Sequence, residues 1–135
     1  MTTTNQKVIL VVEDHPQNLE LVTDLLESAG YRVLTATTAE EGLVLTSAHA
    51  PDLVLMDIRL PGLDGLTATR MLKEDAATRT IPVIALTAYA MPEDRERIRD
   101  AGCEGYLTKP LKIPLLLEQI DTCLGHRTSG VGQKD

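Results

Sequence analysis

The feature that most constrains the fold of this chain is a regular alternation of short apolar segments with segments of helical periodicity. Apolar runs predict five buried strands, at residues 7–12, 31–36, 53–56, 82–86 and 105–107. The segments that follow them predict five helices, at about residues 16–29, 39–48, 65–72, 92–100 and 114–124. This alternation predicts an α/β domain in which parallel strands form one sheet with helices on both faces.

Individual residues mark where several of the predicted helices begin and end. Pro16 suits the first turn of the first helix, and Gly30 suits the position after its last turn. Thr38 and Glu41 form a T-x-x-E capping box for the second helix, and Asp64 caps the third. Each of these boundaries therefore has a local chemical reason in addition to the apolar periodicity.

Five parallel strands joined by right-handed crossovers allow few topologies. We expect the flavodoxin-like, doubly wound strand order 2-1-3-4-5 with five helices, in which ligands bind at the carboxyl ends of the strands. Neither a repeat nor a linker interrupts residues 7–124, so we expect one domain there. The polar ends, residues 1–6 and 125–135, are expected to be flexible tails.

Composition argues against several classes of function. The net charge is −7 and the basic residues do not cluster, which argues against direct binding of nucleic acid. The two cysteines, Cys103 and Cys123, form neither a disulfide framework nor a metal-binding spacing. No apolar run is long enough to span a membrane and the N-terminus carries no secretory pattern. We therefore expect a cytoplasmic protein without membrane insertion.

Charged and polar residues stand where the predicted strands end. They are Glu13 and Asp14, then Asp57, Thr87 and Lys109, after the first, third, fourth and fifth strands. In the expected strand order these ends are neighbours, so the side chains converge on one edge. Three crowded carboxylates repel one another unless a cation lies among them, and their oxygens suit a hard ion such as Mg²⁺ or Mn²⁺. The ion and Lys109 together could then receive a phosphoryl group.

Four motifs occur in order at strand ends: VVEDHPQN, LVLMDIRLPGLDG, ALTAYA and YLTKPL. Together they resemble the receiver domain of two-component response regulators, over about residues 7–124. The resemblance extends to single-domain, chemotaxis-regulator-like proteins and to the receivers of hybrid histidine kinases. It implies that Asp57 is the phosphoacceptor, a carboxylate nucleophile that forms an aspartyl phosphate. It also implies that the metal ligands are Glu13, Asp14, Asp57 and the backbone carbonyl of Arg59.

The same resemblance assigns roles around the phosphoacceptor. Thr87 would donate a hydrogen bond to one phosphoryl oxygen, Lys109 would pair with another, and the peptide bond between Lys109 and Pro110 would be cis. Tyr106 occupies the position of the switch aromatic residue, which follows Thr87 when phosphorylation moves it. The small side chain of Ala88 would leave the path to the site open.

Three more residues are expected at the rim of the site. In the receiver fold, Arg59 and Tyr89 would point over the aspartyl phosphate and hinder the attacking water. The alternative is that both side chains swing into solvent and change nothing. His15 follows the acidic pair, but one histidine beside oxygen ligands does not make a zinc site, so we expect a rim residue there.

The resemblance implies a signalling protein that catalyses only the phosphorylation and dephosphorylation of its own aspartate. A sensor histidine kinase, a histidine phosphotransfer protein or both would supply the phosphoryl group. Residues 92–124 would form the face that binds a downstream protein. A stand-alone switch and a phosphorelay shuttle are both compatible with the sequence. From the polar ends we expect a free protein, although a receiver excised from a hybrid kinase also fits the sequence, and we expect no DNA-binding or enzymatic output segment after residue 124.

The residues at the strand ends argue against two other classes of protein. Phosphatases of the haloacid dehalogenase type also use a strand-end aspartate with Mg²⁺, but they need a second aspartate two residues later. Arg59 occupies that position and cannot exchange the proton. A flavodoxin-type electron carrier needs a phosphate loop after the first strand, where Glu13 and Asp14 would repel the flavin phosphate.

Overall fold

A computed structural model describes residues 6–88 and 91–125 of the chain. Five parallel strands form one sheet in the order β2-β1-β3-β4-β5, which confirms the predicted topology. The strands are β1 (Val8–Val12), β2 (Arg32–Ala36), β3 (Leu53–Asp57), β4 (Val83–Thr87) and β5 (Gly105–Thr108). The helices are α1 (Pro16–Ser28), α2 (Ala39–His49), α3 (Gly65–Glu74), α4 (Pro92–Asp100) and α5 (Ile113–Leu124).

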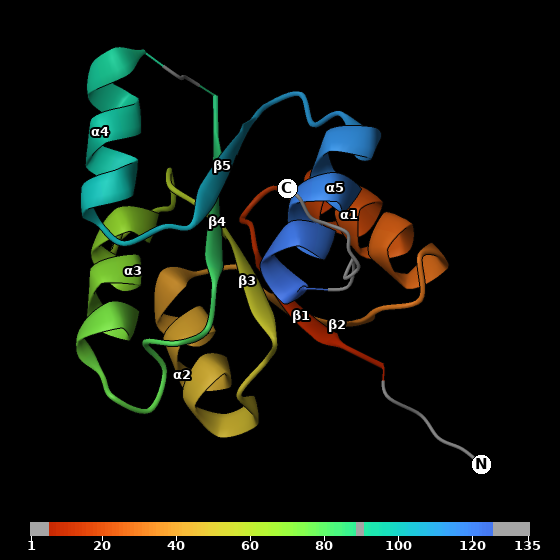
Figure 1. Cartoon of the computed structure of the whole chain (residues 1–135), viewed down its shortest axis with the longest axis horizontal. Helices are drawn as coiled ribbons and strands as arrows, with labels where there is room; N and C mark the ends of the chain where they lie inside the picture. Colours follow the sequence, from red (N-terminus) through yellow and green to blue (C-terminus); the bar gives the residue numbers. More distant parts are fainter. Residues whose placement is uncertain (1–5, 89–90, 126–135) are drawn as a thin grey trace.

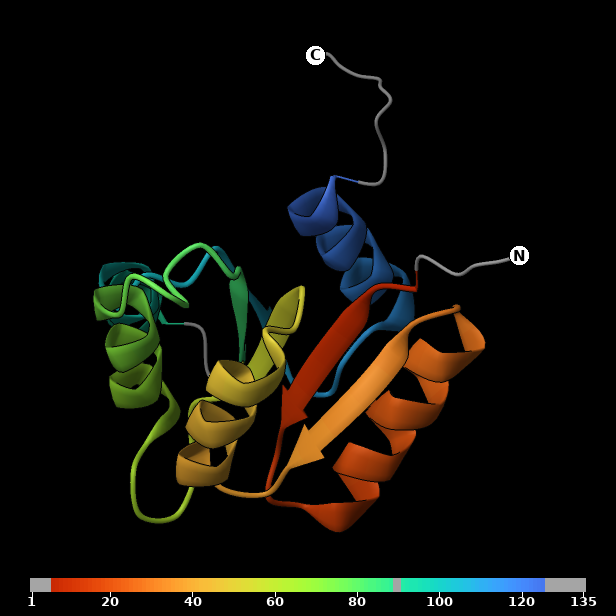
Figure 2. The same ribbon diagram turned by 90° about the horizontal axis from the view of Figure 1, so that it is seen from below.

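The sheet lies between two layers of helices. Helices α1 and α5 cover one face, and α2, α3 and α4 lie on the other side (Figures 1 and 2). Alternate residues of each strand therefore face different layers. In β1, Ile9 and Val11 belong to the core beneath α1 and α5, whereas Leu10 and Val12 belong to the core beneath α2 and α3. All four are fully buried, as strands covered on both faces require.

Side-chain caps begin two of the helices where the sequence predicts them. Thr38 Oγ1 accepts a hydrogen bond from the backbone N–H of Glu41, and Asp64 Oδ1 accepts one from that of Thr67. The return bond of the capping box differs from the expected pattern, because Glu41 Oε1 accepts from the N–H of Thr37 rather than from that of the cap residue. The helix therefore begins where the capping box predicts, although the second capping hydrogen bond comes from a donor one residue earlier than expected.

Strand register brings the predicted site residues to a single edge. Val12 pairs with Met56, Met56 with Ala85, and Thr87 with Thr108, so the strands end nearly level with one another. The backbone N–H of Lys109 donates to the carbonyl of Thr87 over 2.8 Å, which joins the chain after β5 to the end of β4. The peptide bond that follows Lys109 is cis, as the resemblance implied.

Candidate functional site

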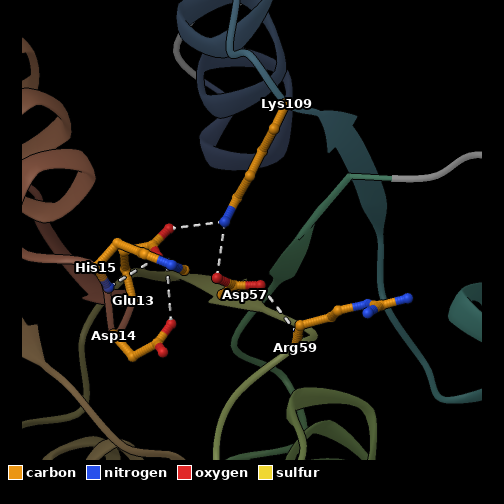
Figure 3. A network of polar contacts seen from close by, with 6 residues as sticks. All are labelled: Glu13, Asp14, His15, Asp57, Arg59 and Lys109. Atoms are coloured by element: carbon orange, nitrogen blue, oxygen red, sulfur yellow. Dashed lines mark hydrogen bonds and ion pairs between the residues drawn. The ribbon is translucent and has the colours of Figure 1, made fainter.

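Asp57 is the last residue of β3 and lies at the centre of the site. Its side chain is held through both oxygens, since Oδ1 accepts from the backbone N–H of Arg59 over 2.9 Å and Oδ2 accepts from Lys109 Nζ over 2.7 Å (Figure 3). The residue is only 2% exposed. The carboxylate is therefore buried and fixed in orientation at the carboxyl end of β3.

Lys109 links two carboxylates from different strands. Besides Asp57, its Nζ lies 3.1 Å from Glu13 Oε1, and Glu13 is as deeply buried as Asp57. The lysine reaches this position because it follows β5 directly, while Glu13 follows β1 directly. One ammonium group thus stands between two buried anions, and a second cation is needed to balance them once Asp14 is included.

Asp14 and His15 complete the acidic end of the site. Asp14 Oδ1 is buried and accepts no hydrogen bond from the part of the chain that the structure describes. His15 Nδ1 lies 3.3 Å from that oxygen and 3.2 Å from Glu13 Oε2, and the His15 backbone N–H donates to the same Glu13 oxygen. A buried acceptor without a donor is a place where a cation fits.

The pKa values in the site reflect burial and the shared lysine. Burial raises the pKa of Asp57 above its usual range, against the opposing effects of Lys109 and the Arg59 N–H. Burial acts in the same direction on Glu13, but hydrogen bonds from Lys109 and the His15 backbone outweigh it and lower its pKa. Burial disfavours charge on Lys109 as well, yet Asp57 and Glu13 raise its pKa. Glu13 and Lys109 are therefore an ion pair at neutral pH.

The donor atoms suit a hard divalent ion. One ligand atom from each of Glu13, Asp14, His15 and Asp57 can be chosen so that all lie within 4.8 Å of one another. Most of these atoms are carboxylate oxygens, which Mg²⁺ prefers, and Mg²⁺ needs few protein ligands because it keeps several waters. The residues present therefore fit the metal that the sequence predicts.

The other predicted site residues surround this centre at differing exposures. Thr87, the last residue of β4, is 1% exposed, whereas Ala88 after it is exposed. Tyr106 lies in β5 opposite Ala85 and is half-buried, and its carbonyl accepts from Gln119. Tyr89 lies outside the described residues.

Arg59 does not cover the site in this structure. Figure 3 shows its side chain extending away from the Asp57 carboxylate and from Lys109. The arginine instead lines a pocket together with Arg70 and Arg97. The guanidinium therefore does not adopt the expected position over the site here.

Gly65 is a site-forming residue that sequence reasoning missed. It is the first residue of α3, and a Cβ built there would overlap the carbonyl oxygen of Asp57 and lie 2.8 Å from Ile58 Cα. Its backbone N–H donates to the Ile58 carbonyl over 3.2 Å. Only a residue without a side chain lets α3 approach the end of β3 this closely. The available signal was a glycine at the first position of a predicted helix, directly after the capping residue Asp64.

Comparison with known proteins agrees with this geometry. The sequence model of the response regulator receiver domain matches residues 9–121. The polar-differentiation response regulator DivK of Brucella ovis is 47% identical over 119 residues, which cover 88% of this chain and 97% of that protein. No helix among the described residues is long and apolar enough to cross a membrane.

Solved structures share the fold across nearly the whole chain. The receiver domain of sensor histidine kinase PA1611 from Pseudomonas aeruginosa, solved with a magnesium ion in its active-site cleft, is 38% identical with a TM-score of 0.83. That match covers 89% of this chain and 98% of the relative. The chemotaxis protein CheY4 of Vibrio cholerae is 25% identical with a TM-score of 0.84, covering 88% and 99% of the two chains. Because the family model matches residues 9–121 and these relatives align along nearly the whole chain, the chain belongs to the response regulator receiver domain family.

Proposed function

We propose that this receiver domain accepts a phosphoryl group on Asp57 in a reaction that depends on Mg²⁺, with Mn²⁺ as a substitute. The observation that carries the proposal is the way the Asp57 carboxylate is held. Arg59 N–H binds one oxygen and Lys109 binds the other, at the end of a fully buried strand. A carboxylate positioned through both oxygens loses little freedom when it attacks phosphorus.

Metal ligands are the first part of the mechanism. Asp14, Asp57 and the backbone carbonyl of Arg59 would hold the ion, with Glu13 as a further ligand, directly or through water. When bound, the ion supplies positive charge to the phosphoryl oxygens. The buried Asp14 oxygen without a donor supports this assignment, as does the magnesium ion of the Pseudomonas relative.

Phosphoryl transfer is a simple exchange of bonds. An oxygen of Asp57 attacks phosphorus, the bond from phosphorus to the donor breaks, and the donor leaves with the electron pair. Lys109 turns its ammonium group from Asp57 to a phosphoryl oxygen, and the Thr87 hydroxyl donates to another. The donor is the phosphohistidine of a sensor kinase or of a phosphotransfer protein. Water later attacks the same phosphorus, the bond from phosphorus to the Asp57 oxygen breaks, and inorganic phosphate leaves the restored carboxylate. Both reactions are self-modifications.

The output of the domain follows from the added charge. Phosphorylation replaces a singly charged carboxylate with a group of about two negative charges. Thr87 moves toward that group and Tyr106 follows it, which shifts the equilibrium between two arrangements of residues 92–124. This face then binds a downstream protein in the cytoplasm. The net charge of −7 gives no support for a nucleic-acid partner.

Intact-mass measurement after incubation with acetyl phosphate and Mg²⁺ tests the proposal. The unaltered chain gains one phosphoryl group, and Asp57→Asn gains none. Asp100→Asn is the matched control, because Asp100 is an exposed aspartate at the end of α4. Full labelling of Asp57→Asn, or equal labelling when Mg²⁺ is removed by a chelator, contradicts the proposal.

A second measurement separates a terminal switch from a relay. The phosphorylated chain is mixed with histidine phosphotransfer proteins, and the label is followed on both partners. Transfer within the lifetime of the aspartyl phosphate identifies a shuttle. Retention of the label, together with phosphorylation-dependent binding of a protein to residues 92–124, identifies a switch.

A further inference from the structure

His15 brings a nitrogen donor to a cluster that otherwise offers oxygen. Its Nδ1 lies 3.2 Å from Glu13 Oε2 and 3.3 Å from Asp14 Oδ1. Figure 3 shows the ring beside both carboxylates. The imidazole therefore lies beside both carboxylates of the acidic pair, at the exposed side of the cluster.

We propose that His15 Nδ1 is a metal ligand in this cluster, and that it makes the site prefer a first-row transition-metal ion such as Co²⁺ over Mg²⁺. The inference rests on the metal site of the proposed function and adds one ligand to it. Imidazole nitrogen binds Co²⁺, Ni²⁺ and Zn²⁺ well, whereas Mg²⁺ prefers oxygen. The added nitrogen therefore favours one class of ion and leaves the other nearly unaffected.

The separations between donor atoms fit adjacent ligands of one ion. In an octahedral site with bonds of about 2.1 Å, neighbouring ligand atoms lie about 3.0 Å apart. The distances from His15 Nδ1 to Glu13 Oε2 and Asp14 Oδ1 are 3.2 and 3.3 Å. Small rotations of the side chains would bring these atoms to bonding positions, and the His15 side chain is 67% exposed and so has room to rotate.

Lys109 and His15 contact different oxygen atoms of Glu13. The Lys109 ammonium group contacts Glu13 Oε1 and Asp57 Oδ2. The imidazole nitrogen lies beside Glu13 Oε2 and beside the Asp14 oxygen that accepts no hydrogen bond within the described chain. The nitrogen is therefore next to an unsatisfied acceptor that an ion could bind.

The competing explanation is that His15 only donates a hydrogen bond to the carboxylates. Such a donor would orient the ligands for every divalent ion alike, so its loss would weaken Mg²⁺ and Co²⁺ to the same extent. Discrimination between the two ions is therefore the quantity to measure.

Calorimetric titration with Mg²⁺ and with Co²⁺ tests the inference. The chain has three histidines, so His49→Gln with His126→Gln leaves His15 as the only imidazole. Adding His15→Gln to this background should lower Co²⁺ affinity at least about tenfold, which is the loss typical of removing even a supporting partner of a ligand. Mg²⁺ affinity should change less than about twofold, because Mg²⁺ takes oxygen ligands. Asp14→Asn should weaken both ions.

Proton NMR of the Co²⁺ form gives an independent readout. Paramagnetically shifted imidazole signals should be present in the background protein and absent after His15→Gln. An unchanged Co²⁺ affinity, or equal losses for the two ions, overturns the inference while Mg²⁺ binding leaves the proposed function intact. Co²⁺ binding with shifted imidazole signals but no Mg²⁺ binding overturns the Mg²⁺ dependence and supports the role of His15.

Discussion

Lys109 Nζ lies 2.7 Å from Asp57 Oδ2, although 52 residues separate the two along the chain. The same nitrogen lies 3.1 Å from Glu13 Oε1. One ammonium group thus partners two buried carboxylates from two other strand ends. We therefore predict that the stability of the metal-free domain and the proposed phosphorylation depend on the same side chain.

Lys109→Gln should lower the free energy of unfolding by about 1–3 kcal/mol in metal-free buffer, because two buried anions lose a shared charged partner. Chemical denaturation measures this change. Lys112→Gln is the matched control, since Lys112 is an exposed lysine three positions along, and it should stay within about 0.5 kcal/mol of the unaltered chain. Equal effects of the two substitutions would show that Lys109 is not a stabilising partner.

Asp57→Asn should raise the metal-free stability near neutral pH, because the neutral amide does not carry the charge that burial disfavours. Burial raises the pKa of Asp57 in the folded state, so the folded state binds this proton more tightly than the unfolded state. The contribution of the protonated Asp57 carboxyl to stability is therefore fully present below the pKa of Asp57 in the unfolded state. It is lost as the pH rises through the pKa of Asp57 in the folded state. Denaturation curves over a pH series should show the advantage of the variant shrinking as pH falls toward about 4. A variant that is less stable near neutral pH would contradict the prediction.

Gly65→Ala should destabilise the fold by about 1–3 kcal/mol, although alanine normally favours a helix over glycine. The new Cβ would overlap the backbone of Asp57, so α3 or the end of β3 must move, and Mg²⁺ affinity should fall with it. Gly42→Ala, a control in α2, meets a methyl group of Val12 at 2.9 Å and should cost less, since a side chain gives way more easily than backbone. Denaturation and metal titration measure the two effects. A Gly65→Ala chain as stable as the original would show that the close approach is not needed.

Arg59→Asn should change the dephosphorylation rate by less than about twofold, because the guanidinium extends away from the Asp57 carboxylate (Figure 3). The rate is measured by loss of label after removal of the phosphodonor. Shielding of the aspartyl phosphate, as predicted from the sequence, then depends on Tyr89, and Tyr89→Ala should accelerate the loss. Acceleration by Arg59→Asn alone would mean that the arginine returns over the site in the phosphorylated state.

Tyr31→Phe should remove about 1 kcal/mol of stability, the net value of one hydrogen bond. Tyr31 OH donates to Asp121 Oδ1 over 2.8 Å and joins the start of β2 to α5. Burial is the main cause that raises the pKa of Tyr31 from 10.0 to about 12, and the hydrogen bond to the Asp121 carboxylate adds to the shift. The stability it provides is therefore intact below pH 10.0 and lost as pH rises toward about 12. Thermal melts of both proteins across that range should converge at the alkaline end, and parallel curves would refute the assignment.

The fold could be predicted because each element carries its own signal. Apolar runs such as residues 8–12 indicate strands buried on both faces, and right-handed crossovers then leave one favoured strand order. That order alone places Glu13, Asp57 and Lys109 at neighbouring strand ends, where the structure brings them within ion-pair distance. The strand order, which the sequence predicts, is therefore sufficient to explain why these charged side chains lie close together.

What the sequence could not predict depends on distances between elements or on free rotation of side chains. The role of Gly65 follows from the approach of α3 to the Asp57 backbone, which no spacing along the chain encodes. The direction of Arg59 is a choice among rotamers at the edge of the sheet, and His15 lies against Glu13 through rotations of the same kind. Helical periodicity and helix caps carry no information about these distances between elements or about these rotamers.

The bridge from Lys109 to Glu13 and Asp57 has a consequence for the growing chain. The two carboxylates come from β1 and β3, while the ammonium group arrives only when β5 pairs with β4. A nascent or truncated chain that ends before residue 109 carries the Asp57 carboxylate without this counter-charge. We therefore expect that such a chain does not undergo the proposed phosphorylation until its last strand and Lys109 have been added.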